Sequence, residues 1–174
     1  TCWRGVPPKG MENEILEIGV ALVDIAKAEV KKSESIIVKP KYSEVSKFCT
    51  KLTGITQEEA KKGVTFKTAC RKLREQYSGR RLAWGSWGDF DYRIINEQCE
   101  RRKLDVPVSK QYMNIRVLYS LFFQQEQGLS LKTALNHSKM EPVGREHDGE
   151  YDAINCARLL CELLKRFNDK MPHV

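Results

Sequence analysis

The first half of the chain has an apolar pattern typical of a strand pair followed by helices. Residues 14–25 (EILEIGVALVDI) are rich in Ile, Val and Leu, which predicts a largely buried strand. Residues 35–38 follow a polar turn and predict a shorter second strand, so we expect an antiparallel hairpin that ends at Pro40. Helical periodicity and capping residues then predict helices over 46–52, stopping at Gly54, from Thr56 onwards, and over 66–77.

The second half of the chain alternates between strand and helix patterns. Residues 81–87 (RLAWGSW) predict a strand that leads into a helix over 91–102. A short extended piece within 111–118 precedes a helix that runs through Phe123, and further helices are expected over 131–136 and 152–167. A hairpin followed by alternating strands and helices indicates an α/β fold with a mixed sheet flanked by helices. No repeat, low-complexity tract or linker interrupts residues 1–174, so we expect one domain.

Composition narrows the class of protein without defining it. An apolar content of 41% with 30% charged residues is ordinary for a globular protein and too apolar for disorder. No apolar run approaches the roughly 20 residues that span a bilayer, so we expect no membrane partner. The net charge of +7, from 30 Lys plus Arg against 23 Asp plus Glu, favours a polyanionic partner such as nucleic acid.

The six cysteines include no C-x-x-C pair and no zinc-finger spacing. Most lie among apolar neighbours, which predicts buried thiols in a reducing compartment. We therefore expect an intracellular protein, cytoplasmic or, in a eukaryote, nuclear. The sequence begins at Thr1 rather than Met, and we expect an upstream segment to be missing.

The segment Gly144–Leu160 (GREHDGEYDAINCARLL) places His147 five residues ahead of Asp152, at the start of an apolar helical run. The carboxylate of Asp152 lies on the predicted buried stripe of this helix, which continues through Cys156, Leu159, Leu160 and Leu163. An ionised carboxylate there is costly unless a cation, a metal ion or hydrogen-bond donors offset its lost hydration. A favourable charge near the helix N-terminus, or a helix cap, is the alternative interpretation.

A second carboxylate occurs where a Gly-rich strand end turns into a helix, in WGSWGDFDYRII. Asp91 shares a helix face with Ile94, Ile95 and Cys99 and is expected to point inward, whereas Asp89 is expected to cap the helix. Carboxylates at strand ends and helix starts can meet at a sheet edge and bind divalent cations through oxygen. With His147 as general base, the two aspartates are consistent with metal-assisted hydrolysis; a surface or hydrogen-bonded histidine is the alternative.

These motifs match a known family. GDFD at 88–91 and HDGEYD at 147–152 resemble the second and third motifs of the DEDDh 3′→5′ exonucleases, which have a ribonuclease H-like fold. TCW at the N-terminus, KFCTKLTGIT at 47–56 and the GREHDGEYD segment resemble the branch that trims histone mRNA ends and small RNAs. That branch also includes bacterial predicted exonucleases linked to the control of sporulation.

The resemblance implies roles for individual residues. Asp91 and Asp152 would be ligands of two Mg²⁺ or Mn²⁺ ions, and His147 would be the general base that helps to release nucleoside 5′-monophosphates. The implied substrates are single-stranded RNA or 3′ overhangs, and single-stranded DNA as a further candidate; protein partners stay unknown. The implied substrate-binding residues are Thr1, Trp3, Leu52, Thr53 and Gly54.

One motif of the family is missing. The first motif, D-x-E, lies in the family on a strand immediately upstream of the residues that match TCW, and the sequence begins after it. We therefore expect a sheet that lacks its first strand, an exposed pairing edge, and weak or no activity of the 174-residue polypeptide. The alternatives are a non-catalytic nucleic-acid-binding domain and a regulatory interaction domain, although an adaptor would not need inward-facing charges.

Other charged residues are given minor roles. Glu12, Glu14 and Glu17 alternate with apolar residues and are expected at solvent or edge positions. His137 and His173 receive no role. The densest basic residues, which are expected to be solvated or to guide a phosphate backbone, are Arg71, Arg74, Arg80, Arg81, Arg101, Arg102 and Lys103.

Overall fold

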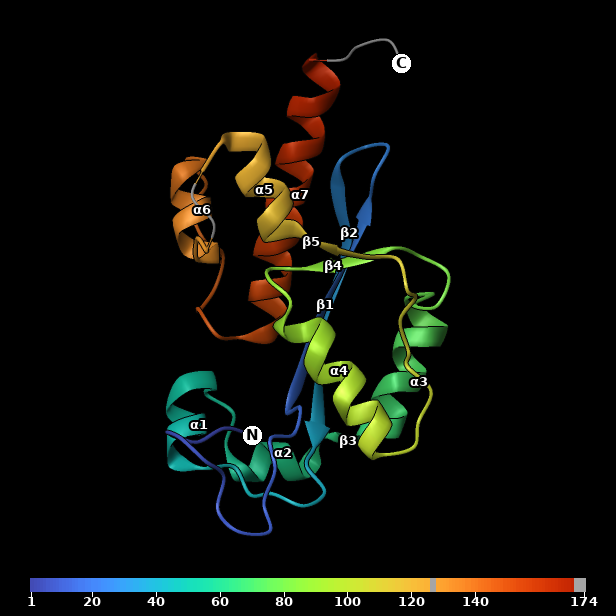
Figure 1. Cartoon of the computed structure of the whole chain (residues 1–174), viewed down its shortest axis with the longest axis vertical. Helices are drawn as coiled ribbons and strands as arrows, with labels where there is room; N and C mark the ends of the chain where they lie inside the picture. The colour runs from blue at the N-terminus through green and yellow to red at the C-terminus, as the bar shows by residue number, and fades with distance from the viewer. Residues whose placement is uncertain (126–127, 171–174) are drawn as a thin grey trace.

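The fold consists of a strand hairpin and a second small sheet, with helices packed around them (Figure 1). The structure, a computed structural model, describes residues 1–125 and 128–170. None of the helices in this part is long and apolar enough to cross a membrane. The elements are β1 (Glu17–Asp24), β2 (Glu29–Lys39), α1 (Lys47–Thr53), α2 (Gln57–Lys62), β3 (Val64–Thr65), α3 (Phe66–Gln76), β4 (Trp84–Ser86), α4 (Phe90–Arg101), β5 (Tyr112–Asn114), α5 (Ile115–Phe123), α6 (Leu131–His137) and α7 (Gly149–Lys170).

The first two strands form the expected antiparallel hairpin. Their register runs from Glu17 opposite Ile37 to Asp24 opposite Glu29, with one irregularity after Leu22. Strand β2 is longer than the predicted 35–38, because its first half is polar and largely exposed and therefore gives no apolar signal. The short β3 adds to β2 in parallel, with Val38 opposite Val64.

The second sheet is a parallel pair, β4 and β5, with Trp84 opposite Tyr112 and Ser86 opposite Asn114. The strand predicted over 81–87 is only three residues long, because residues 79–82 form a turn instead. The expected mixed α/β fold is confirmed, but the described strands form two separate ladders, β1-β2-β3 and β4-β5. Within the described residues β1 pairs only with β2, which leaves its other edge without ladder hydrogen bonds.

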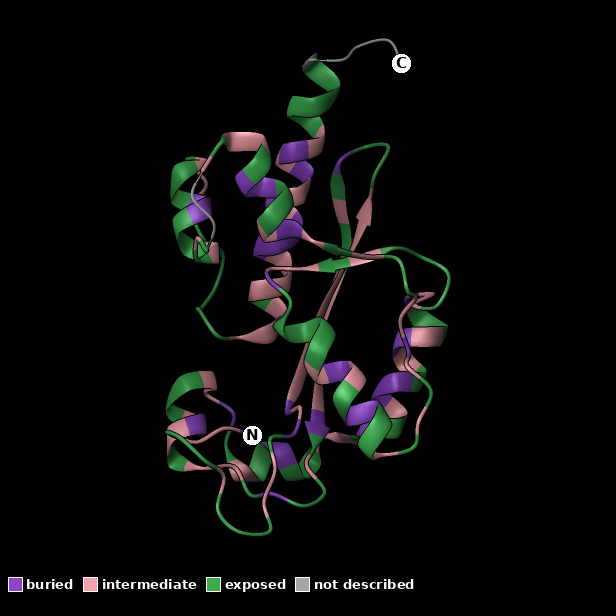
Figure 2. Ribbon diagram, viewed as in Figure 1, coloured by how far each residue is buried: buried purple, intermediate pink, exposed green. Residues whose placement is uncertain are grey.

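Three apolar clusters form the core (Figure 2). The largest joins β2 to α3 and α4 through residues such as Val38, Leu73 and Ile95. The second joins α5, α6 and α7 around Tyr119 and Leu159. The third holds α1 and α2 against the residues that precede β1, and its buried members are Leu16, Cys49, Ile55 and Ala60. Five of the six cysteines are buried, as their apolar neighbours predicted.

Helix α7 begins in direct contact with β1. The backbones of Gly19 and Gly149 approach so closely that a Cβ at Gly19 would overlap the Gly149 carbonyl. Glu17 accepts a hydrogen bond from the Gly149 amide at 2.9 Å and another from the Ser35 hydroxyl at 2.7 Å. These contacts start the helix at Gly149, three residues before the predicted start, and they fix the segment with His147 and Asp152 against the sheet.

The expectation that Glu14 faces solvent is wrong. Its side chain is 1% exposed, and its carboxylate accepts hydrogen bonds from the amides of Lys41, Tyr42 and Ser43, each at 2.8 Å. The guanidinium of Arg102 forms an ion pair with it. Glu14 precedes β1, so the alternation of strand faces does not decide where its side chain points.

Two related expectations change with it. Arg102 also pairs with Glu12 at 2.9 Å and is only 9% exposed, so it serves the fold rather than a phosphate backbone. Glu17 is half-buried and anchors α7, as described above. His137, which received no role, has a partner: its Nδ1 lies 2.7 Å from the Tyr119 hydroxyl. His173 lies outside the described residues.

Candidate active site

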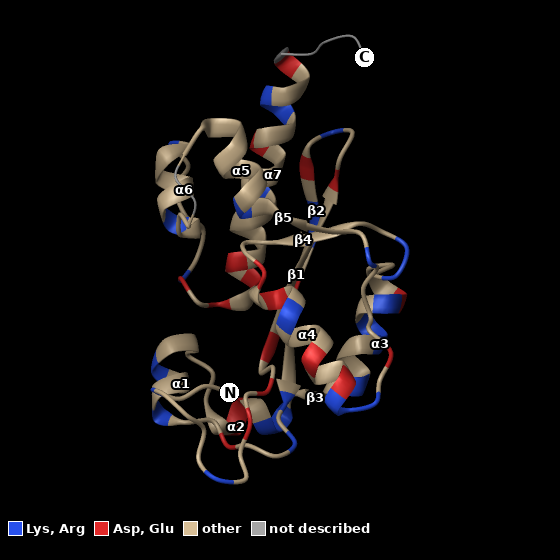
Figure 3. Cartoon of the chain, in the orientation of Figure 1, with Lys and Arg blue, Asp and Glu red and all other residues tan. Residues whose placement is uncertain are grey.

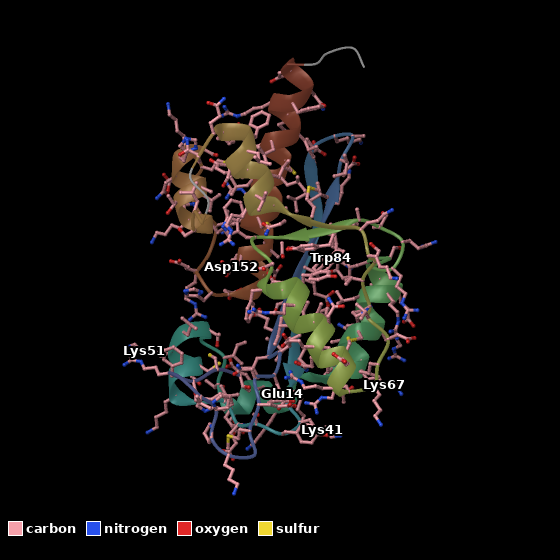
Figure 4. The ribbon with its side chains drawn as sticks, viewed as in Figure 1. Glu14, Lys41, Lys51, Lys67, Trp84 and Asp152 are labelled. Atoms are coloured by element: carbon pink, nitrogen blue, oxygen red, sulfur yellow. The ribbon has the colours of Figure 1, made fainter. Side chains whose placement is uncertain are left out.

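Asp152 lies in the first turn of α7, where the helix leaves β1 (Figure 4). Burial raises the pKa of its carboxyl to about 6, although the nearby charge and backbone amide of His147 act in the opposite direction. One turn further on, Cys156, Leu159 and Leu163 are buried as the helical pattern predicted. Leu160 is only half-buried. The carboxylate therefore lies at the polar end of an apolar stripe.

Asp91 lies in the first turn of α4, directly after β4. The residue as a whole is exposed, and the inward orientation of its carboxylate stays a prediction. The surrounding protein nevertheless displaces water from its carboxyl and raises the pKa above the ordinary value, while a hydrogen bond from Ser86 acts against this. Asp89 is at the N-cap position as predicted, but its side chain makes no capping hydrogen bond.

The two aspartates act on the same buried thiol through their charge. Burial raises the pKa of Cys156 to about 12, and the negative charges of Asp91 and Asp152 both contribute to the increase. The fold therefore brings two carboxylates, 61 residues apart in the sequence, within electrostatic range of one side chain. Figure 3 shows the acidic starts of α4 and α7 near the middle of the molecule.

Contacts with β5 fix the turn that precedes Asp91. Gly88 has a positive φ of 96°, and its carbonyl accepts hydrogen bonds from the Ser86 and Tyr112 hydroxyls. The Tyr112 ring packs on Trp84 and Tyr92, with centroids 4.8 and 4.7 Å apart. Sequence reasoning missed Ser86 and Tyr112, because their role depends on the pairing of β4 with β5.

His147 lies in the exposed loop between α6 and α7, next to Asp152. Its φ of 67° is a left-handed backbone conformation that a non-glycine residue adopts only at some cost. The neighbouring contacts of the loop must therefore hold it.

The residues expected to contact the substrate lie on the α1 side of the molecule. Leu52 is 37% exposed at the end of α1, and Trp3 is half-buried. The Thr53 hydroxyl donates to the Cys49 carbonyl at 2.9 Å. Thr1 is buried, and its hydroxyl donates to the Glu12 carbonyl and accepts from the Glu14 amide.

The α1 side and the His147 loop meet through a residue that sequence reasoning missed. Arg145 reaches from the loop and donates a hydrogen bond to the Thr53 carbonyl. Its guanidinium occupies the space where Gly54 has no Cβ. The basic residue directly after Gly144 is the only sequence signal, and its partner is 92 residues away.

The side chains of this site are of the type that binds divalent metal ions. Carboxylate oxygens are the ligands that Mg²⁺ and Mn²⁺ prefer, and poorly hydrated carboxylates gain most from a cation. Within residues 1–125 and 128–170, no group of three or more His, Cys, Asp or Glu side chains is arranged to hold a metal ion. The described residues thus offer two carboxylates of the right kind rather than a complete ligand set.

Two carboxylates and an imidazole in this arrangement are compatible with metal-assisted hydrolysis. Comparison with known proteins identifies the family. A model of the exonuclease family (RNase T) matches residues 5–160, and the chain belongs to this family.

Curated relatives agree with this assignment. Human 3′-5′ exoribonuclease 1 is 31% identical over 188 residues, which cover 98% of this chain and 53% of the human protein. Zebrafish ERI1 exoribonuclease 2 is 31% identical over 182 residues, which cover 91% of this chain and 32% of that protein. The chain therefore spans about half the length of the human relative and about a third of the length of the zebrafish relative.

Solved structures confirm the resemblance to DEDDh nucleases. The nuclease domain of 3′hExo, a DEDDh family member bound to rAMP, superposes with a TM-score of 0.86 at 28% identity, covering 95% of this chain and 88% of that domain. A 3′-exonuclease in a structure of histone mRNA stem-loop recognition gives a TM-score of 0.83 at 28% identity, covering 95% and 78%. Membership of the DEDDh family implies that divalent metal ions are used.

Proposed function

We propose that residues 1–174 form a metal-dependent 3′→5′ exonuclease domain that releases nucleoside 5′-monophosphates from RNA 3′ ends. The observation that carries the proposal is that Asp91 and Asp152, from distant parts of a chain of the exonuclease family, both act electrostatically on the buried Cys156, with His147 acting on Asp152. RNA is preferred over single-stranded DNA because curated relatives are named exoribonucleases and a structural neighbour was solved with rAMP.

Asp91 and Asp152 would hold Mg²⁺ or Mn²⁺. Burial raises the pKa of each carboxyl, and a bound cation would offset this loss of hydration, which supports the proposed role. When bound, divalent ions supply activation of a water molecule and stabilisation of the leaving 3′-oxygen.

His147 would accept the proton of the attacking water. An imidazole serves this purpose at neutral pH. The loop position of His147 leaves the ring accessible to solvent, and its contact with Asp152 keeps it beside the proposed metal ligands.

The 3′-terminal nucleotide would lie between the His147 loop and the end of α1. Leu52 and Trp3 offer apolar surface on which a base can pack, an interaction worth about 1–3 kcal/mol per stacked base on an aromatic side chain. The exposed Leu52 and the backbone of Thr53 and Gly54 border the same space as Arg145. Thr1 stays a prediction, since its hydroxyl already bonds to backbone groups.

The test is degradation of a 5′-labelled single-stranded RNA by the full-length protein, with Mg²⁺ or Mn²⁺ and with a chelator. We expect stepwise shortening from the 3′ end that stops with chelator and in Asp152→Asn. Asp148→Asn is the matched control, because Asn is an equally good N-terminal cap and Asp148 lies just before the first turn of α7, four residues ahead of Asp152. Equal degradation by Asp152→Asn and the parent would contradict the proposal.

Two further outcomes separate the alternatives. We expect the 174-residue polypeptide to have little or no activity, because a two-metal site needs more carboxylates than the two that the described residues offer. RNA binding by the full-length protein without shortening of the RNA, with either metal, would favour a non-catalytic nucleic-acid-binding domain.

The buried thiols support an intracellular location, cytoplasmic or, in a eukaryote, nuclear.

A further inference from the structure

The loop between α6 and α7 is anchored at both ends but exposed in between. Residues 141–147 are all exposed. On the N-terminal side, the Asn155 side chain of α7 accepts from the Val143 amide at 3.0 Å and donates to its carbonyl at 2.9 Å. On the C-terminal side, Glu17 binds the amide of Gly149. The position of His147, between these anchors, depends on what holds the middle of the loop.

Arg145 provides that contact. Its Nη2 donates to the carbonyl oxygen of Thr53, in the last turn of α1. This carbonyl lies among the last four of the helix, which have no partner within the helix itself. Among the hydrogen bonds of residues 1–125 and 128–170, the Arg145 bond is the one that joins this loop to α1.

Gly54 makes the close approach feasible. Its positive φ of 79° ends α1, and its amide donates to the Thr50 carbonyl at 2.7 Å. A Cβ at this position would overlap the guanidinium of Arg145. Lysine cannot replace arginine in the same way, because a compact ammonium lacks the planar set of donors of a guanidinium. The bridge thus depends on both residue types.

The backbone of His147 shows why a bridge is needed. A left-handed conformation in a non-glycine residue persists only when surrounding contacts over-determine it. The adjacent Glu146 offers little restraint, since its partner Lys132 is 3.7 Å away and both side chains are more than half exposed. Arg145, two residues from His147, is the better anchored neighbour.

We propose that Arg145 is a positioning residue that fixes the His147 imidazole relative to the Leu52–Gly54 segment. The inference rests on the proposed function, in which the terminal nucleotide lies between these two groups. Arg145 acts through the loop rather than on the reacting atoms. Its loss lets the imidazole drift while the metal ligands on α4 and α7 keep their places.

The experiment measures kcat and KM of the full-length protein with Mn²⁺ on labelled single-stranded RNA. Arg145→Ala lowers kcat about 30-fold with KM changed less than about threefold, because displacement of a catalytic group by about 1 Å costs up to 10²-fold in rate. Millimolar methylguanidinium restores part of the kcat of Arg145→Ala. Lys132→Ala is the matched control: it removes the same charge beside the same loop and leaves kcat unchanged.

A double-mutant cycle tests the bridge itself. Gly54→Ala displaces the guanidinium and also strains the left-handed backbone at this position, so the combined loss of kcat in Gly54→Ala with Arg145→Ala is less than the product of the two single losses. Additive losses in the cycle would overturn the proposal, as would an Arg145→Ala variant that changes only KM, in the manner of a lost RNA-attracting charge.

A second readout separates this inference from the proposed function. If the parent protein and Asp152→Asn degrade RNA equally, the proposed function fails. Amide hydrogen exchange over residues 144–149 then still reports on the bridge: Arg145→Ala exchanges several-fold faster and Lys132→Ala does not. Equal exchange in the two variants would overturn the positioning role.

Discussion

Glu14 and Asp152 both carry carboxylates with reduced hydration, but the protein replaces the lost water differently at each. Glu14 is almost completely buried, but three backbone amides and the Arg102 guanidinium surround its oxygens. Asp152 is less buried, yet burial raises the pKa of its carboxyl to about 6 because fewer donors replace the water. Figure 4 shows the two groups at separate places, Asp152 at the start of α7 and Glu14 below it.

The difference separates a structural carboxylate from a candidate functional one. Buried charges are tolerated when hydrogen bonds and an ion pair satisfy them, and then they hold the fold together. A carboxylate whose anion is left poorly stabilised makes the metal-free protein less stable, and such sites are where cations bind. Depth of burial alone would have identified the wrong residue.

The largest expected effect comes from neutralising each of these two carboxylates in turn. Asp152→Asn should lower kcat about 10³-fold, since loss of a metal ligand removes several kcal/mol of transition-state stabilisation. Glu14→Gln should leave kcat within about threefold while it lowers the free energy of unfolding, because the amide is a weaker acceptor for Arg102. Both are measured by RNA degradation and by urea unfolding. A large loss of kcat in Glu14→Gln in the folded protein would break the distinction.

Next in size is the removal of the Arg102 cation. Arg102→Met should lower the free energy of unfolding by about 3 kcal/mol, because it leaves the buried charge of Glu14 without its ion-pair partner. The control is Arg101→Met, whose more exposed guanidinium contacts Glu12 at 3.5 Å and should cost about 1 kcal/mol or less. Equal losses in urea unfolding would show that burial of the pair does not matter.

The pH dependence of the metal-free protein gives a smaller effect. The folded pKa of Asp152, about 6, lies above its ordinary value of 3.8, so the folded state binds the proton more tightly than the unfolded state. The stabilisation of the folded protein by the protonated Asp152 carboxyl is therefore complete below pH 4 and is lost as the pH rises through 6. Asp152→Asn should remove this dependence and make the protein more stable than the parent at pH 8, by up to about 2 kcal/mol.

Thermal unfolding in a chelator from pH 5 to pH 8 measures this contribution. Saturating Mg²⁺ should reverse the order at pH 8, because the cation stabilises the parent and has lost a ligand in the variant. A parent whose stability rises from pH 5 to pH 8 as steeply as that of Asp152→Asn would contradict the raised pKa.

Much of the local structure could be predicted from the sequence, because its causes are local. The capping residues Ser46 and Thr56, the terminating Gly54 and the apolar stripe of α7 each act within a few residues, and the helices they predict are present. The hairpin followed from its apolar strand and polar turn. The resemblance to the exonucleases rested on short motifs, and it is confirmed at the level of family and fold.

What the sequence did not reveal depends on distant partners. Glu14 is satisfied by Arg102, Ser86 is held by Tyr112, and Arg145 is bound to Thr53, and no local pattern announces any of these pairs. The two-residue β3 was missed because its pairing with β2 leaves almost no apolar signal. Long-range hydrogen bonds thus decide which charged residues are structural, and the three-dimensional fold is needed to see them.

The smallest expected effect concerns Asp89, a carboxylate that stays in water. It is exposed at the N-cap of α4 and makes no capping hydrogen bond, so Asp89→Ala should change the free energy of unfolding by less than about 0.5 kcal/mol. Asp91, two residues away, should behave like Asp152: Asp91→Ala should lower kcat about 10³-fold, whereas Asp89→Ala should keep kcat within about threefold of the parent. Unfolding in urea and the RNA assay measure both. A comparable loss of kcat in both variants would show that solvation does not distinguish functional carboxylates at this turn.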